Sequence, residues 1–318
     1  MNDLTIQAAY KICHDIMKNH SKNFFHAFKN ISSRRFQYIQ AIYAFCRYVD
    51  DVTDIIGVTS PEKAIELLTG IKSEIQTFYI DKVSYKIPET IIYQMDWFPA
   101  FIDTLQSIEI NPKYFFLQID GQLADLNFSQ PVTESELIDY SEQVAGSVGL
   151  MLMPMLVSDN ISADNPLTID ACNQLGLAMQ ITNILRDIGE DCRERNRVYI
   201  PIQIMDRFEI DEQYIISQAN NISKPVQIST SFIKMLEYLA QNAENMYANF
   251  LKAIEFFDVK CQFSMVVAAL NYRGILDAVR HNHYDCLTTR CYTNKKQQES
   301  ALLEAQSIID KMKRDKMS

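Results

Sequence analysis

The chain of 318 residues carries 40 acidic and 30 basic side chains, which gives it a formal charge of −10. This charge excludes general binding to nucleic acid, because no basic stripe compensates for it. The apolar runs are far shorter than the roughly 18 to 20 residues that span a bilayer, and no apolar signal core stands near the first residue, so we expect a soluble, cytoplasmic protein.

Apolar residues recur at helical spacing along nearly the whole sequence, and Gly and Pro total only 8 and 9. In chain order, helices are predicted for residues 8–28, 36–56, 64–78 and 89–107, from Pro112 onward, for 135–157 after a capping box at Thr133 and Glu136, and for 168–191, 228–256, 262–280 and 298–313. No linker separates two halves. We therefore expect one all-α domain over residues 1–318, a helical bundle whose sites are built from inward-facing side chains.

Seven cysteines form an odd set without a Cys-x-x-Cys pair. This pattern argues against both a disulfide framework and a zinc site. The cysteines are therefore predicted to be reduced thiols, most of them in the core.

Asp50 and Asp54 stand four residues apart on a predicted helix. Ideal α-helical geometry places them about 40° apart around the axis and about 6 Å along it, where they can share a cation. Tyr43 and Arg47 continue the same face. By itself such a pair is more typical of a solvated surface, but here apolar residues such as Ile42 surround it, so the carboxylates need a counter-charge.

A second acidic element lies in the helix predicted for residues 168–191. Asn183, Asp187 and Asp191 form a row of oxygen ligands at i, i+4 and i+8 in an otherwise apolar segment. Two such rows that face one another would suit Mg²⁺, which takes a few carboxylates and completes its shell with water and substrate phosphate oxygens. The structural alternative is a pair of buried salt-bridge networks, with Arg47 and Arg186 as the partners.

These elements resemble those of the squalene and phytoene synthases, most closely the bacterial dehydrosqualene (4,4′-diapophytoene) synthases. The resemblance covers nearly the whole chain. It also includes the segments His20-Ser21-Lys22-Asn23-Phe24, Asp120-Gly121-Gln122-Leu123-Ala124-Asp125-Leu126 and Val144-Ala145-Gly146-Ser147-Val148-Gly149, together with Tyr140, Tyr272 and Arg290. It implies a single-domain helical bundle of the isoprenoid synthase type with a central apolar cavity.

The resemblance implies a role for each matching residue. The magnesium ligands would be Asp50, Asp54, Asn183, Asp187 and Asp191. The residues that contact diphosphate would be His20, Ser21, Lys22, Asn23, Tyr43, Arg47, Gln180, Arg186, Tyr272 and Arg290. Without the resemblance, His20 is a capping or surface histidine and Tyr140 a half-buried core tyrosine. With it, the Tyr140 hydroxyl would act near the second diphosphate.

Two further features bear on the site. Gly146 and Gly149 lie inside a helical pattern, where each costs roughly 1 kcal/mol relative to Ala, so we expect a ligand or a helix to approach closely there. The chain also departs from the family, because no second tyrosine follows Tyr140, and the segment from Asp191 to Tyr199 is one residue longer than usual.

The expected reaction joins two farnesyl diphosphates through presqualene diphosphate to dehydrosqualene, with Mg²⁺ as cofactor. The alternatives are phytoene synthesis from geranylgeranyl diphosphate and squalene synthesis with NADPH. From a different class comes a non-catalytic assembly factor on this fold. The water-insoluble product and the basic residues Lys311, Lys313, Arg314 and Lys316 suggest peripheral contact with the inner face of the membrane. The helix dipole also accounts for these charges.

Overall fold

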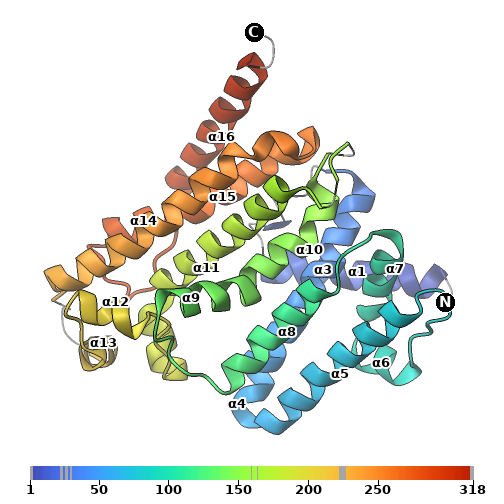
Figure 1. Ribbon diagram of the computed structural model, residues 1–318, viewed down its shortest axis with the longest axis horizontal. Coiled ribbons are helices and arrows are strands. Elements are labelled where there is room, and N and C mark those ends of the chain that lie inside the picture. Colours follow the sequence, from blue (N-terminus) through green and yellow to red (C-terminus); the bar gives the residue numbers. More distant parts are fainter. Residues whose placement is uncertain are drawn as a thin grey trace. The chain divides into compact units, whose positions relative to one another are not determined.

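The computed structural model describes residues 3–21, 24–25, 28, 31–158, 160–162, 164–221 and 227–315. Helices dominate these residues, and the described part of the chain holds an isolated antiparallel bridge, Val157 with Phe257, in place of a β-strand (Figure 1). The all-α prediction is confirmed. No helix among these residues is both long and apolar enough to cross a bilayer.

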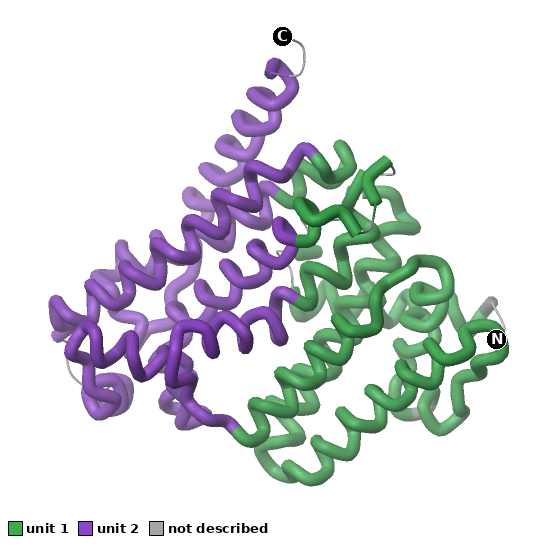
Figure 2. The backbone as a smooth tube through the Cα atoms, in the orientation of Figure 1, with its two compact units in different colours: residues 1–127, 147–169, 256–265 green, residues 128–146, 170–255, 266–318 purple. Residues whose placement is uncertain are grey.

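Two compact units divide the chain, and each combines segments that are distant in sequence (Figure 2). Unit 1 comprises residues 1–127, 147–169 and 256–265, and unit 2 comprises 128–146, 170–255 and 266–318. The single domain expected over residues 1–318 stays a prediction, as does its central cavity.

Unit 1 packs around a cluster of aromatic rings. Phe45 stacks on Phe101 with centroids 5.1 Å apart, and Phe115 meets both rings edge-on at 5.3 Å. All three side chains are fully buried. They join three helices and leave the opposite face of one of them, α3, for polar residues. The elements are α1 (Asp3–His20), α3 (Ser33–Asp51), η1 (Val52–Ile56), α4 (Gly57–Thr59), α5 (Pro61–Ile80), α6 (Glu89–Gln94), α7 (Phe98–Ser107), α8 (Lys113–Leu126) and α10 (Ser147–Leu156).

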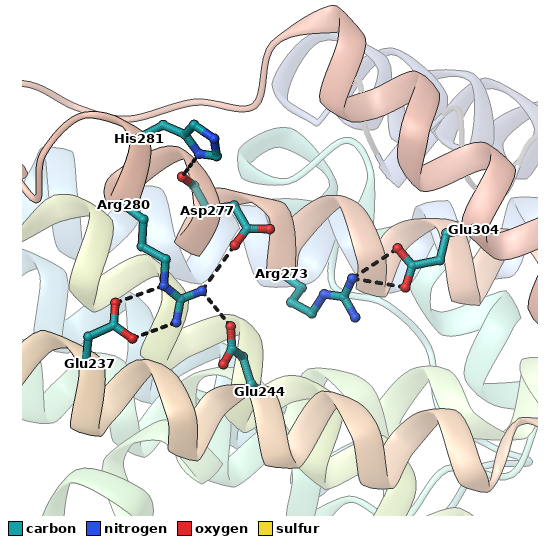
Figure 3. A network of polar contacts seen from close by, with 7 residues as sticks. All are labelled: Glu237, Glu244, Arg273, Asp277, Arg280, His281 and Glu304. Carbon is teal, nitrogen blue, oxygen red and sulfur yellow. Dashed lines mark hydrogen bonds and ion pairs between the residues drawn. The ribbon is translucent and has the colours of Figure 1, made fainter.

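Unit 2 is held together by buried polar contacts as well as by apolar packing. Thr182 and Tyr247 share a buried hydrogen bond of 3.1 Å, and Arg280 contacts several carboxylates (Figure 3). The elements are α9 (Glu134–Ser141), η2 (Glu142–Gly146), the greater part of α11 (Pro166–Arg195), α12 (Ile202–Arg207), α13 (Glu212–Ala219), α14 (Thr230–Lys252), the greater part of α15 (Val259–His281) and α16 (Lys295–Asp315), with the short η3 (Ile254–Phe256) after α14.

Several predicted boundaries were wrong. The helix expected at 8–28 ends at His20. The helix expected at 89–107 is split after Gln94, because Pro99 has no N–H to donate to the carbonyl of Met95, four residues earlier. The helices α12 and α13 were not predicted. The capping box is confirmed on one side: the Glu136 N–H donates to Thr133 Oγ1 at 3.1 Å, while the Glu136 carboxylate accepts from the Val132 N–H at 2.7 Å.

Two helices contain a five-residue π turn where the sequence predicted regular α-helix. The turn η1 follows α3, and there the Gly57 N–H bonds to Val52 O, five residues back. The turn η2 joins α9 to α10 and contains Val144, Ala145 and Gly146. Turns of this kind occur frequently at functional sites, and both of these lie in the motifs that carry the family resemblance.

Close helix approach explains Gly146, as the sequence predicted. A Cβ atom there would lie 2.2 Å from Asn173 Oδ1, and a Cβ on Gly176 would lie 2.5 Å from Ala145 O. The two glycines therefore let η2 and α11 meet backbone to backbone.

Candidate active site

In unit 1, Asp50 lies on α3 and Asp54 in η1. The ideal α-helical geometry assumed for this pair is therefore wrong, since the π turn changes the spacing between them. Gly57, directly after the turn, faces α8 so closely that a Cβ would lie 2.3 Å from Leu126 Cδ2. The turn thus ends against α8, and the chain around Asp54 is fixed by packing.

Asp50 is held by a residue that the sequence analysis did not single out. Gln122 Nε2 on α8 donates to Asp50 Oδ1 at 3.1 Å, and Arg47 Nη1 lies 3.8 Å from Oδ2. Partial burial raises the pKa of Asp50 to about 6, and the charge of Asp54 adds to this effect, while Arg47 and Gln122 oppose it. The side chain still exposes 44% of its surface, so a cation can reach the carboxylate.

Arg47 makes its main contact with Asp51. Its Nε donates to Asp51 Oδ2 at 3.0 Å, and its Nη2 makes a second, shorter contact with Oδ1. The guanidinium is thus paired with a carboxylate, as the salt-bridge alternative requires. Asp51, not Asp50, is the better-bonded partner.

The segment before α3 is described only in part. Ser21 hydrogen-bonds the hydroxyl of Tyr43, whose pKa rises to about 12 chiefly because of burial. His20 is exposed at the end of α1 and makes no polar contact with the other described candidates. Lys22 and Asn23 lie outside the described residues. Unit 1 therefore brings together Ser21, Tyr43, Arg47 and Asp50.

In unit 2, Asp187 is the most strongly paired candidate. Arg186 Nε donates to Oδ1 at 2.7 Å, and Arg290 approaches the same carboxylate with Nε at 3.0 Å and Nη2 at 3.1 Å. Arg290 also contacts Glu190 at 2.9 Å. Only 14% of the Asp187 side chain is exposed. Tyr272 lies in the same electrostatic environment, and its burial raises its pKa.

The remaining ligands of the row differ in their partners. Asp191, with 11% of its side chain exposed, accepts from Arg195 at 2.9 Å. Burial raises the pKa of Asp191 to about 7, with Arg195 opposing the shift and Asp187 adding to it. Asn183 Oδ1 is buried and has no hydrogen-bond partner among the described residues. Gln180 is half-buried on the same face.

The donor set fits the metal that the sequence predicted. An unpaired buried oxygen is unfavourable by about 1–3 kcal/mol, and an amide oxygen that shares a helix face with carboxylates at i+4 and i+8 has the chemistry of a hard-cation ligand. No three His, Cys, Asp or Glu side chains in the described part of the chain are arranged to hold a metal by themselves. Mg²⁺ does not need such a cage, since water and substrate phosphates complete its shell.

Tyr140 has an aromatic partner that sequence reasoning missed. Its ring stacks on that of Tyr199, with centroids 5.2 Å apart and an interplanar angle of 23°. Arg197 Nη1 donates to the Tyr199 hydroxyl at 3.1 Å. The segment after Asp191 turns at Asn196, which adopts a φ of 52°, where asparagine is tolerated better than most residues. The chain then brings Tyr199 back against Tyr140. Whether this segment is one residue longer than in other family members stays a prediction.

Comparisons with known proteins identify the family. Residues 17–297 match the squalene/phytoene synthase model. The chain belongs to the squalene/phytoene synthase family. These enzymes are prenyltransferases that condense prenyl units head to head, so the resemblance found in the sequence is confirmed.

Three relatives illustrate the family's range. The chain is 32% identical to the 4,4′-diapophytoene synthase of Staphylococcus haemolyticus, over 92% of this chain and 94% of that one. It is 28% identical to the 15-cis-phytoene synthase of Synechocystis sp., over 91% and 81% of the two chains. A crystal structure of a dehydrosqualene synthase in complex with a ligand matches with a TM-score of 0.80 at 29% identity, over 96% of this chain and 98% of that one.

The contact between Gln122 and Asp50 gives a prediction that needs no substrate. Gln122→Leu removes a hydrogen bond that favours the ionised carboxylate, so the pKa of Asp50 should rise above about 6. An NMR titration of labelled aspartate carboxyls measures this. The matched control is Gln118→Leu, on the same helix as Gln122. Gln118 Oε1 accepts a buried hydrogen bond of 2.9 Å from the Ser147 hydroxyl on α10, and its loss should leave Asp50 unchanged. An identical Asp50 titration in both variants would contradict the assignment.

Proposed function

We propose that this chain condenses two farnesyl diphosphates head to head through presqualene diphosphate to dehydrosqualene, in a Mg²⁺-dependent reaction. The observation that carries the proposal is the row on α11, where Asn183, Asp187 and Asp191 offer oxygen ligands beside the guanidinium groups of Arg186 and Arg290. The 4,4′-diapophytoene synthase at 32% identity supports the choice of product.

The acidic residues would hold the metal. Asn183, Asp187 and Asp191 would bind it in unit 2, and Asp50 and Asp54 in unit 1. When bound, Mg²⁺ neutralises the charge that develops on the departing diphosphate, which is Lewis-acid assistance without a protein nucleophile.

The basic residues would bind the diphosphates. Arginine has a planar fork that suits both carboxylate and phosphate oxygens. Arg47, Arg186 and Arg290 are paired with Asp51, Asp187 and Glu190 in the ligand-free protein. A metal–diphosphate pair would give each of these side chains a new partner of opposite charge. The cation would bind the carboxylates, and the phosphates would bind the guanidinium groups.

Tyr140 would act in the second half of the reaction. Its hydroxyl would assist departure of the second diphosphate or the final loss of a proton from the hydrocarbon. Stacking on Tyr199 fixes the plane of the ring. The neighbouring π turn, η2, ends the helix that carries Tyr140 and begins the Val-Ala-Gly segment.

Tail length would be set in unit 1 by the aromatic residues after α1. Phe28 is 3% exposed, and its ring lies 5.4 Å from that of Phe24. Two bulky side chains that pack in this way favour the shorter farnesyl tail over geranylgeranyl. The 28% identity to a phytoene synthase keeps the longer substrate as the second candidate.

A product assay tests the proposed function. Purified protein with Mg²⁺ and farnesyl diphosphate should release dehydrosqualene, identified by mass, with no requirement for NADPH. Squalene formed only with NADPH, or phytoene formed in preference from geranylgeranyl diphosphate, would replace the proposed product. A protein inert toward both diphosphates would favour the non-catalytic assembly factor.

Replacement of Asn183 separates a ligand role from a structural one. Asn183→Leu removes a buried oxygen that has no partner among the described residues, so the melting temperature should hold or rise. Turnover should nevertheless fall at least 100-fold, and excess chelator should abolish the wild-type activity until Mg²⁺ is restored. Asn173→Leu is the control, because its Oδ1 is also buried on α11 without a partner in the described part of the chain. Full activity in Asn183→Leu would exclude the metal assignment.

Asp50→Asn and Asp187→Asn should also abolish turnover, but only the first is expected to melt normally. The carboxylate of Asp50 is 44% exposed, whereas that of Asp187 is buried between two guanidinium groups. Removal of one partner from a buried ion pair is destabilising by about 3–5 kcal/mol. Thermal melts and turnover measured on both variants check this, and a normal melt for Asp187→Asn would show that its ion pairs contribute little.

Tyr140→Phe tests the order of the two half-reactions. The variant keeps the ring and its stacking on Tyr199 but lacks the hydroxyl. Presqualene diphosphate should therefore accumulate, and hydrocarbon formation should slow more than consumption of farnesyl diphosphate. Rapid quenching followed by mass analysis measures both rates. Equal slowing of the two steps, with no intermediate, would rule out a selective role for Tyr140.

A further inference from the structure

The connection between α15 and α16, residues 282–294, carries Arg290 and is fastened to α11 within unit 2. The Gly189 N–H donates to Cys286 O at 3.1 Å. Arg193 Nη1 donates to Leu287 O and also, at 3.1 Å, to Ala219 O. Gly189 and Arg193, which lie on either side of Asp191 on α11, thus hydrogen-bond to the carbonyl oxygens of two consecutive residues of the connection.

The closest approach between α11 and the connection is at Gly189. A Cβ atom there would lie 1.8 Å from Leu287 O and 2.4 Å from its carbonyl carbon. Both are backbone atoms, which cannot rotate away as a side chain can. Any larger residue at this position therefore forces the connection off α11, and glycine is required for the approach itself.

Both ends of the connection are also anchored. Arg280, in the last turn of α15, pairs with Glu237 at 2.8 Å and Glu244 at 2.6 Å on α14 (Figure 3). Arg273 on α15 contacts Glu304 on α16 at 3.0 Å. Just beyond α15, His283 and Tyr284 have φ values of 54° and 63°, and such a reversal persists only where the surroundings fix it.

Hydrogen bonds between its own residues stabilise a turn in the middle of the connection. The Asp285 carboxylate accepts from the Thr288 N–H at 2.9 Å and from the Thr288 hydroxyl at 2.6 Å. Two residues later, Arg290 reaches Asp187 and Glu190. The Arg290 side chain is 36% exposed, so its own burial does not fix it. The position of its backbone does.

We propose that Gly189 and Arg193 are positioning residues, which hold the α15–α16 connection against α11 and so place the Arg290 guanidinium for a diphosphate. The proposal rests on the proposed function for its ligand. Its structural part, the dependence of Arg290 on Gly189, is independent of any substrate.

Trypsin reports on the structural part. Trypsin cleaves after Arg290 only where the surrounding segment can become extended, so release of Cys286 and Leu287 from α11 should favour cleavage of the bond to Cys291. Gly189→Ala should accelerate this cleavage at least 10-fold. The cleavage rate is measured under native conditions, with mass spectrometry to identify the fragments. Gly70→Ala is the matched control, because Gly70 also lies within a helix but a Cβ atom there would meet nothing within 4 Å. The control should be cleaved at the wild-type rate.

Calorimetry with inorganic pyrophosphate and Mg²⁺ reports on the functional part. Arg290→Ala and Gly189→Ala should each weaken binding about 10-fold, and the double variant should be no weaker than either one. Such non-additivity shows that Gly189 acts through Arg290. A purely structural role would instead make the two losses multiply.

Arg193→Gln covers the case in which Gly189→Ala fails to fold. It removes the guanidinium from Leu287 O and Ala219 O without adding volume. Like Gly189→Ala, it should therefore accelerate cleavage after Arg290 and weaken pyrophosphate binding. Unchanged cleavage in these variants would overturn the proposal, as would pyrophosphate binding that is independent of Arg290. Wild-type protein that binds pyrophosphate but forms no hydrocarbon would contradict the proposed function alone.

Discussion

Pairing between arginine and carboxylate inside apolar helices is the interaction on which this site depends. A carboxylate as buried as Asp187 is unfavourable unless a cation accompanies it. Asp187 has two, Arg186 and Arg290, and Asp191 has Arg195. The acidic row on α11 is therefore compatible with folding before any ligand arrives. Under the proposed function, the same pairs would hold guanidinium groups where phosphate oxygens bind.

Under the proposed function, the salt-bridge networks and the metal site would be two arrangements of the same residues. The sequence analysis treated them as rivals, and the structure contains the ion pairs that the structural alternative required. A metal–diphosphate pair would be neutralised by the same groups after an exchange of partners. No buried charge would be left alone in either arrangement, which would keep the cost of the exchange low.

Long periodic helices and the two acidic motifs could be predicted, because apolar spacing and residue type carry that information directly. The contacts around those motifs could not. Gln122 reaches Asp50 from a helix 72 residues away in sequence, and Tyr199 meets Tyr140 only through the fold. Neither residue type has a spacing signal. The π turns could not be predicted for another reason. Hydrogen bonds to residue i−5 leave the apolar pattern of η1 and η2 nearly unchanged.

The choice of asparagine at position 183 follows from the same charge balance. Asp187 and Asp191 each have an arginine, whereas Asn183 Oδ1 has no partner among the described residues. A third carboxylate there would need a third cation, or it would raise the pKa of its neighbours. An amide offers the same oxygen without charge, and leaving it unpaired is unfavourable by only about 1–3 kcal/mol. An amide on this row thus avoids a third charge, and its Oδ1, like that of Asn173 on the same helix, has no hydrogen-bond partner among the described residues.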